Sequence, residues 1–287
     1  EITCRDWSSD VCSSDLTCDR VLAYEIFNAC IQSAQILNID KEFSDSLQQA
    51  IKKFPPIRLR ANGGVREWLE DYDEAHPNHR HTSHLLALYP YEQITLDKTP
   101  ELAAGARKTI EDRLAAEGWE DTEWSRANMI CFYARLKDTK QAYQSVLTLE
   151  SIFTRENLLS ISPAGIAGAP YDIFILDGNT AGAAGIAEML VQGHEGYIEF
   201  LPCLPEQWNV GTYKGLCVKG GAEVSAAWNQ SLINEATLKA TADNTFTVKV
   251  PQGKNYTITL NNKRINPVIN NGLITVSMKA KDILKFK

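Results

Sequence analysis

The sequence lacks a long hydrophobic run and a cluster of basic residues. No apolar stretch approaches the roughly 20 residues that a membrane-spanning helix needs, so we expect no bilayer span. The formal net charge is −7, with 29 Lys and Arg against 36 Asp and Glu. An acidic chain without a Lys/Arg run does not favour nucleic acid or an anionic membrane as a partner. A neutral or small substrate fits this composition better.

The first residues have little in common with the rest of the chain. Residues 6–16, with the sequence DWSSDVCSSDL, resemble the conceptual translation of a sequencing adapter. We therefore expect residues 1–16 to be non-native and the reading frame to be truncated upstream.

Paired cysteine motifs are also missing. No two of the seven cysteines form a Cys-X-X-Cys motif. Without residues 1–16, the odd and widely spaced remainder predicts buried free thiols, and neither a disulfide framework nor a zinc site. These cysteines are Cys18, Cys30, Cys131, Cys203 and Cys217.

Helical spacing of apolar residues extends over residues 17–190. The first run predicts one buried face of a long helix. Ser44 is a plausible cap for a second helix that ends before Pro55, and Thr99 with Pro100 marks the start of a third. Residues 129–136 and 142–152 predict an antiparallel pair, which suggests a bundle or an α/α toroid. The first run comprises Val21, Leu22, Ile26, Phe27, Cys30, Ile31, Ala34 and Leu37.

The apolar period changes from 3.6 to 2 near Gly196. Alternation in residues 197–201, 215–228, 245–250, 256–260 and 273–276 predicts strands, separated by turn residues. We therefore expect a small antiparallel β domain over residues 194–287, whose role is to cap and pack.

One isolated carboxylate precedes a helix of small residues. Asp177-Gly178-Asn179 has the composition of a turn, and Asn179 or Thr180 could cap the helix that follows. Gly and Ala at positions 181–185 would let neighbouring backbones approach closely. Asp177 is either a dipole-stabilising residue at a helix start or a catalytic base.

The densest polar segment is residues 66–84, which holds four of the five histidines. His76, His79, His81 and His84 raise the possibility of a metal site, although Arg80 in their midst would repel a cation. A hydrogen-bonded network that makes a loop rigid is the second interpretation. The third is a substrate pocket, in which Arg80 and the imidazoles bind hydroxyl groups while Trp68 and Tyr72 offer flat apolar faces.

A second patch, residues 118–127, brings aromatic, acidic and arginine side chains to a helix entrance. Trp124 and Arg126 belong to it. Such a patch is common in carbohydrate clefts, and it equally describes a core tryptophan beside a surface ion pair.

These motifs together resemble those of glycoside hydrolase family 95, in the same order along the chain. They are EW at 67–68, DYDE at 71–74, HRHTSHL at 79–85, LYP at 88–90, WSRA at 124–127, LDGN at 176–179 and AGIAEML at 184–190. The match continues with LPCLP at 201–205, Trp208, Gly211, KGL at 214–216 and GG at 220–221.

The resemblance implies a multidomain α and β chain. The carboxy-terminal half of an all-α (α/α)6 barrel, over residues 17–193, would precede a β-sandwich-like domain over residues 194–287. It also implies an inverting exo-α-L-fucosidase acting on 1,2-linked fucose of oligosaccharides or glycans, and no metal or other cofactor is expected. Compartment and oligomeric state stay open, with a periplasmic or secreted parent favoured.

Residue roles follow from the same resemblance. Asp177 matches the carboxylate that activates water through an asparagine pair, and Arg80 and His81 match residues that grip the sugar. Trp124, Asn179 and Trp68 are expected near it. The general-acid glutamate and both asparagines of the family lie upstream, so the chain alone is expected to be inactive.

Two departures bear on specificity. The family commonly has His-Pro-Pro-Phe-Gln-Ile before Asp-Gly-Asn, where this chain has residues 163–176, and Thr180 replaces an aromatic. Fucose and L-galactose therefore both stay open. A non-catalytic carbohydrate-binding protein and a metal-dependent lyase or isomerase are the rival interpretations.

Overall fold

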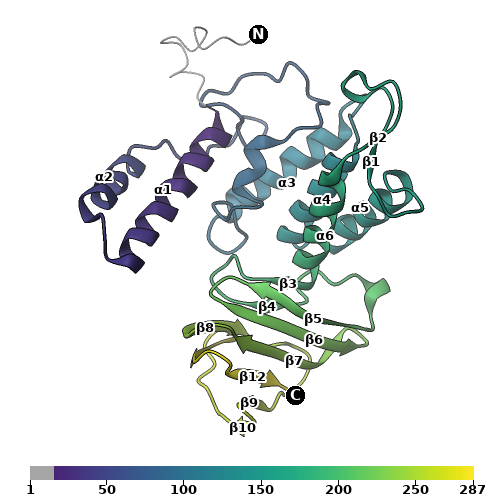
Figure 1. The fold of residues 1–287 in the computed structure, drawn as a ribbon. Helices are drawn as coiled ribbons and strands as arrows, with labels where there is room; N and C mark the ends of the chain where they lie inside the picture. Colours follow the sequence, from purple (N-terminus) through teal and green to yellow (C-terminus); the bar gives the residue numbers. More distant parts are fainter. Residues whose placement is uncertain (1–15) are drawn as a thin grey trace. The chain divides into compact units, whose positions relative to one another are not determined.

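The computed structural model describes residues 16–287, which form two compact units (Figure 1). One unit ends at Glu120 and the other is Asp121–Lys287. Apart from Leu16, the adapter-like segment lies outside the described residues. Helices dominate up to Leu190 and antiparallel strands follow, as predicted. The (α/α)6 barrel stays a prediction.

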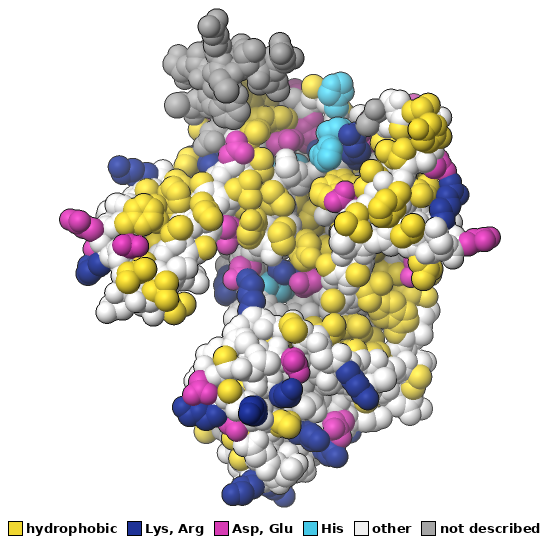
Figure 2. Space-filling view, viewed as in Figure 1, with side chains coloured by type: hydrophobic (Ala, Val, Ile, Leu, Met, Phe, Trp, Pro, Cys, Tyr) yellow, Lys and Arg dark blue, Asp and Glu magenta, His cyan; other side chains and the backbone are white. Residues whose placement is uncertain are grey.

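The unit that ends at Glu120 contains α1 (Thr17–Leu37), α2 (Lys41–Ile51), the 3-10 helix η2 (Ser83–Ala87) and α3 (Pro100–Ala115). The predicted buried face of α1 is only partly buried. Val21 and Ile31 are buried, but Ile26 and Leu37 are 59% and 63% exposed. Figure 2 shows hydrophobic side chains at the surface of α1 and α2.

Two predicted helix caps differ from the structure. α2 begins at Lys41 after Asp40, and Ser44 is buried inside the helix, so Ser44 is not its cap. Pro100 is the first residue of α3 as predicted, but the Thr99 side chain does not cap that helix. Its Oγ1 instead accepts a hydrogen bond of 2.8 Å from the Thr95 N–H.

The helices of the second unit are α4 (Glu123–Arg135), α5 (Thr139–Ile152) and α6 (Leu176–Leu190). A capping box starts α4: the Thr122 N–H donates to Ser125 Oγ, and the Ser125 N–H donates to Thr122 Oγ1. The small residues of α6 allow close packing as predicted. A Cβ added at Gly185 would lie 2.6 Å from Ile130 on α4.

A six-stranded antiparallel sheet with the order β10-β9-β12-β7-β6-β5 forms most of the β part (Figure 1). β8 pairs with β11, β3 with β4, and β1 with β2. Side chains such as Val224, Leu238 and Phe286 are fully buried in its core. The strands are β1 (Ile161–Ser162), β2 (Ile173–Phe174), β3 (Val191–Gln192), β4 (Glu199–Phe200), β5 (Gly211–Val218), β6 (Ala222–Asn229), β7 (Leu232–Ala240), β8 (Asn244–Lys249), β9 (Ile258–Leu260), β10 (Lys263–Arg264), β11 (Leu273–Met278) and β12 (Ile283–Phe286).

The alternating residues 215–228 lie in a hairpin of β5 and β6, which the predicted Gly-Gly turn divides. Gly220 and Gly221 form its turn, with φ of 89° and 83°, a backbone conformation that favours glycine. β7 was not predicted, because its buried positions include the small residues Ala236 and Ala240, which weaken the apolar alternation.

The described cysteines are all free, as expected. Cys131 and Cys203 are buried, whereas Cys217 is exposed on β5, so the prediction of buried thiols is wrong for Cys217. Within residues 16–287, no helix combines the length and apolarity that crossing a membrane requires.

Candidate active site

The six candidate site residues fall into two sets, one in each unit. Trp68, Arg80 and His81 belong to the unit that ends at Glu120. Trp124, Asp177 and Asn179 belong to Asp121–Lys287. Each set has its own supporting contacts.

Asp177 is exposed in the first turn of α6. The helix begins at Leu176, so Asp177-Gly178-Asn179 is helical and is not a turn before the helix. Neither Asn179 nor Thr180 caps it, and the Thr180 hydroxyl donates back to the Leu176 carbonyl at 3.3 Å. A carboxylate in the first helical turn is favoured by the helix dipole.

Gly178 is buried because two side chains come close to its Cα. An added Cβ would lie 2.7 Å from Ser160 Cβ and 2.8 Å from Glu123 Cβ. The absence of a side chain at Gly178 therefore allows this close packing. The packing holds in place the first turn of α6, which carries Asp177.

Asn179 ties the same turn to the loop before β1. Its Oδ1 accepts a 2.9 Å hydrogen bond from the Ser160 N–H, and its Nδ2 donates to the Leu158 carbonyl at 2.7 Å. Both ends of this amide thus have protein partners.

Glu123 is a buried carboxyl group that the sequence analysis missed. It is the first residue of α4 and only 2% exposed. Burial is the main cause that raises its pKa, and the charge of Asp177 raises it further, while a hydrogen bond with Ser162 opposes them. Its Oε2 has no hydrogen-bond partner among the described residues. An acid at a helix start is ordinary in sequence, so no sequence signal distinguished Glu123.

Trp124 follows directly and is half-buried. Its carbonyl accepts a 2.9 Å hydrogen bond from Asn128 Nδ2. A partly exposed indole at a helix start can offer an apolar face to a ligand.

In the other unit, Glu120 joins His79 to Arg80. Its Oε2 lies 3.0 Å from His79 Nδ1 and 2.9 Å from Arg80 Nη1, and it accepts from the Arg80 N–H at 3.3 Å. Burial by itself would raise the pKa of Glu120. The hydrogen bonds with His79 and Arg80 outweigh this effect, so the pKa of Glu120 is lowered. The Glu120 carboxylate is therefore charged at neutral pH.

His81 stands against His79, with ring centroids 4.9 Å apart in a T-shaped arrangement. Burial and the neighbouring charge of Arg80 lower the pKa of His81. Its imidazole is consequently neutral at pH 7, and it can both donate and accept hydrogen bonds.

The four histidines do not form one network. His84 is fully buried, neither ring nitrogen has a hydrogen-bond partner among the described residues, and burial lowers its pKa to about 3. His76 is exposed. Across residues 16–287, no three His, Cys, Asp or Glu side chains gather as a metal-binding group.

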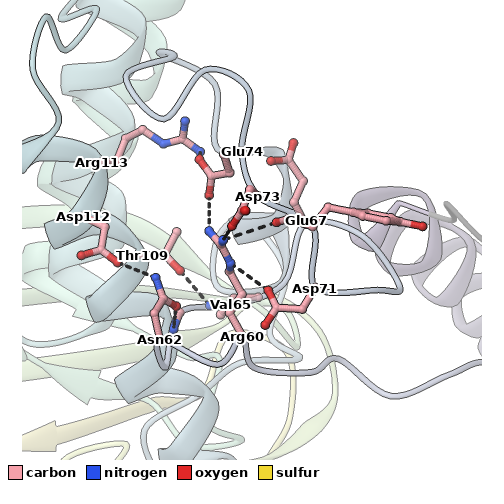
Figure 3. A network of polar contacts seen from close by, with 12 residues as sticks. Arg60, Asn62, Val65, Glu67, Asp71, Asp73, Glu74, Thr109, Asp112 and Arg113 are labelled. Atoms are coloured by element: carbon pink, nitrogen blue, oxygen red, sulfur yellow. Dashed lines mark hydrogen bonds and ion pairs between the residues drawn. The ribbon is translucent and has the colours of Figure 1, made fainter.

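Several carboxylates of the polar segment turn towards Arg60 (Figure 3). Arg60 pairs with Asp71 at 3.1 Å and with Glu74 at 2.9 Å, and Glu74 also pairs with the buried Arg113 at 2.9 Å. A pocket of about 340 Å³ lies beside this network, and none of the six candidate residues lines it. These carboxylates hold the loop in shape.

Trp68 is half-buried and packs edge-on against Tyr72, with centroids 6.3 Å apart. Tyr72 is 47% exposed. The two rings therefore contact each other edge-on at the protein surface, and their role in sugar binding stays a prediction.

Two family descriptions match the chain almost end to end. The glycosyl hydrolase family 95 catalytic domain matches residues 4–190, and the family's C-terminal domain matches residues 192–285. The helical part of the chain thus corresponds to the catalytic domain of this glycoside hydrolase family, and the β part corresponds to the family's C-terminal domain. The chain belongs to glycoside hydrolase family 95.

Curated relatives carry fucosidase names. "Alpha-L-fucosidase 2" of Arabidopsis thaliana is 32% identical over 223 residues, which cover 76% of this chain and 26% of that protein. "Probable alpha-fucosidase A" of Aspergillus niger is 27% identical, covering 73% of this chain and 28% of the relative. The chain thus spans about a quarter of the length of these relatives. A solved GH127 beta-arabinofuranosidase gives a TM-score of only 0.28 at 12% identity, over 91% of this chain and 42% of that one, too low to support an argument.

Proposed function

We propose that the complete protein carrying this sequence is an inverting exo-α-L-fucosidase. It releases terminal α-1,2-linked L-fucose from oligosaccharides or glycans, and its helices form part of an (α/α)6 barrel. The observation that carries this proposal is the exposed Asp177, held in the first turn of α6 by the close packing at Gly178, in a chain of family 95.

Asp177 acts as the carboxylate that activates water. In an inverting glycosidase, acid and base stand roughly 6.5 to 9.5 Å apart, so that water fits between the base and the anomeric carbon. Arg80 and the neutral imidazole of His81 bind sugar hydroxyl groups. Trp124 and Trp68 offer apolar faces, and Asn179 keeps the turn of Asp177 in place.

Residues 1–287 alone should not turn over substrate. The family resemblance assigns the general acid to a segment with no match in this sequence, and the curated relatives are three to four times longer than the matched region. The test expresses these residues alone and assays fucose release from 2′-fucosyllactose. Turnover comparable with that of a complete family 95 enzyme would contradict this part of the proposal.

Substrate comparison separates the remaining alternatives. Because residues 163–176 and Thr180 depart from the family pattern, α-L-fucosides and α-L-galactosides should be assayed side by side on the complete enzyme. Faster galactoside hydrolysis would replace the fucosidase assignment. Retained sugar affinity without turnover would instead favour a carbohydrate-binding protein.

A further inference from the structure

We propose that Glu120 is a positioning residue for sugar binding and that it acts through Arg80. This inference rests on the proposed function, because it takes Arg80 as a residue that grips the sugar. The sequence places Glu120 in the polar patch of residues 118–127, but neither that patch nor the family resemblance gives Glu120 a role of its own.

One carboxylate oxygen of Glu120 organises two consecutive residues. Its Oε2 contacts the His79 ring at Nδ1 (3.0 Å), the Arg80 backbone N–H (3.3 Å) and the Arg80 guanidinium at Nη1 (2.9 Å). These contacts fix both the backbone and the side chain of Arg80. Hydrogen bonds to a charged acceptor are the stronger kind.

The segment that carries Glu120 is itself joined to the segment before Arg80. The Glu120 N–H donates to the Asn78 carbonyl at 3.0 Å, and Asn78 Nδ2 donates to the Gly118 carbonyl at 3.0 Å. Gly118 has a φ of 71°, which lets the chain turn back towards Asn78. These hydrogen bonds therefore hold residues 78–80 and 118–120 together.

The contacts with Glu120 also leave part of the Arg80 guanidinium available to a ligand. A guanidinium has five N–H donors, and its contact with Glu120 uses Nη1, so further donors of the planar group can bind hydroxyl oxygens. With the Arg80 side chain only 23% exposed and already held, less conformational freedom is lost when a ligand binds.

The test measures kcat and KM for 2′-fucosyllactose in the complete enzyme, with Arg80→Ala, Glu120→Gln, Glu120→Asp and the double variant Arg80→Ala/Glu120→Gln. We expect Glu120→Gln to raise KM by about 10- to 100-fold with a much smaller change in kcat, since the negative charge that pairs with Arg80 is lost and the hydrogen bonds become weaker. Glu120→Asp keeps the charge and should recover part of the affinity. Asp112→Asn, which alters an acid paired with Lys108 in the same unit, should leave KM unchanged.

If Glu120 acts through Arg80, the effects of the two substitutions on KM should not be additive in free energy. The double variant should have the same KM as Arg80→Ala. A KM equal to wild type in Glu120→Gln, or effects that multiply in the double variant, would overturn the role of Glu120 alone. A wild-type KM in Arg80→Ala would overturn the sugar-binding role of Arg80 and this inference with it. Thermal unfolding of each variant separates loss of affinity from loss of fold.

Discussion

The side chain of Glu123 packs directly against Gly178. A Cβ built on Gly178 would lie 2.8 Å from both Cβ and Cγ of Glu123. Because Gly178 is the residue after Asp177, this contact joins the start of α4 to the turn that carries the proposed base.

Substitution Gly178→Ala tests this close packing. The new methyl group meets Cβ and Cγ atoms near the backbone, which cannot swing away, so the overlap should cost about 1–3 kcal/mol. This exceeds the gain of up to about 1 kcal/mol from replacing a helical glycine with alanine. Urea unfolding of the chain should show the loss. Gly193→Ala, where nothing lies within 4 Å of an added Cβ, is the control and should change stability by less than about 0.5 kcal/mol.

Substitution Glu123→Gln tests the buried carboxyl group. Its pKa is raised in the folded chain, so Glu123 contributes stability that is present at low pH and lost as the pH rises through its folded pKa. The neutral Gln cannot show this loss. The variant should therefore gain stability relative to wild type between pH 4.5 and pH 7.5, as measured by urea unfolding. A relative stability that is constant, or falls over this interval, would show that Glu123 is not perturbed by burial.

His84 predicts a fall in stability at acidic pH. Its folded pKa of about 3 lies below the unfolded value of 6.5, so its contribution is present above pH 6.5 and lost as the pH falls towards 3. Over this range, protonation of this one group lowers the free energy of unfolding by up to about 1.4 kcal/mol per pH unit. His84→Phe should flatten this part of the stability profile, whereas the exposed His76→Gln should not. Identical acid profiles for His84→Phe and wild type would contradict the account of His84.

Cysteine labelling gives a simple check of burial. Cys217 is exposed, whereas Cys203 is buried and burial raises the pKa of its thiol to about 11. Iodoacetamide at pH 8 should modify Cys217 first and reach Cys203 only after denaturation, as followed by peptide mass spectrometry. Equal labelling of both residues under native conditions would show that the β part is more open than described.

Periodicity predicted most of the helices because long amphipathic runs repeat over several turns. It located the start of α5 to within three residues, with Asp138 capping that helix through the Gln141 N–H, but α4 begins six residues before the predicted start at residue 129. The exposed side of α1 could not be predicted, since an apolar stripe does not say whether a neighbouring element covers it. β7 could not be predicted because the buried positions Ala236 and Ala240 are small residues, which contribute little to the hydrophobic alternation.

Site prediction from the sequence was limited by long-range packing. The motif around Asp177 could be recognised, but its position inside α6 depends on Ser160 and Glu123, which are distant in sequence. Likewise, Glu120 joins Arg80 across 40 residues. Such partners have no local pattern, so only the fold brings them together.

The most direct test of the proposed function is Asp177→Asn in the complete enzyme. The account predicts that kcat for fucose release from 2′-fucosyllactose falls by about 10²- to 10⁴-fold, as expected when a general base is removed. Because Asp177 is exposed, the thermal stability should change little. A variant that folds normally and keeps kcat within a few-fold of wild type would contradict the assignment of Asp177 as the base.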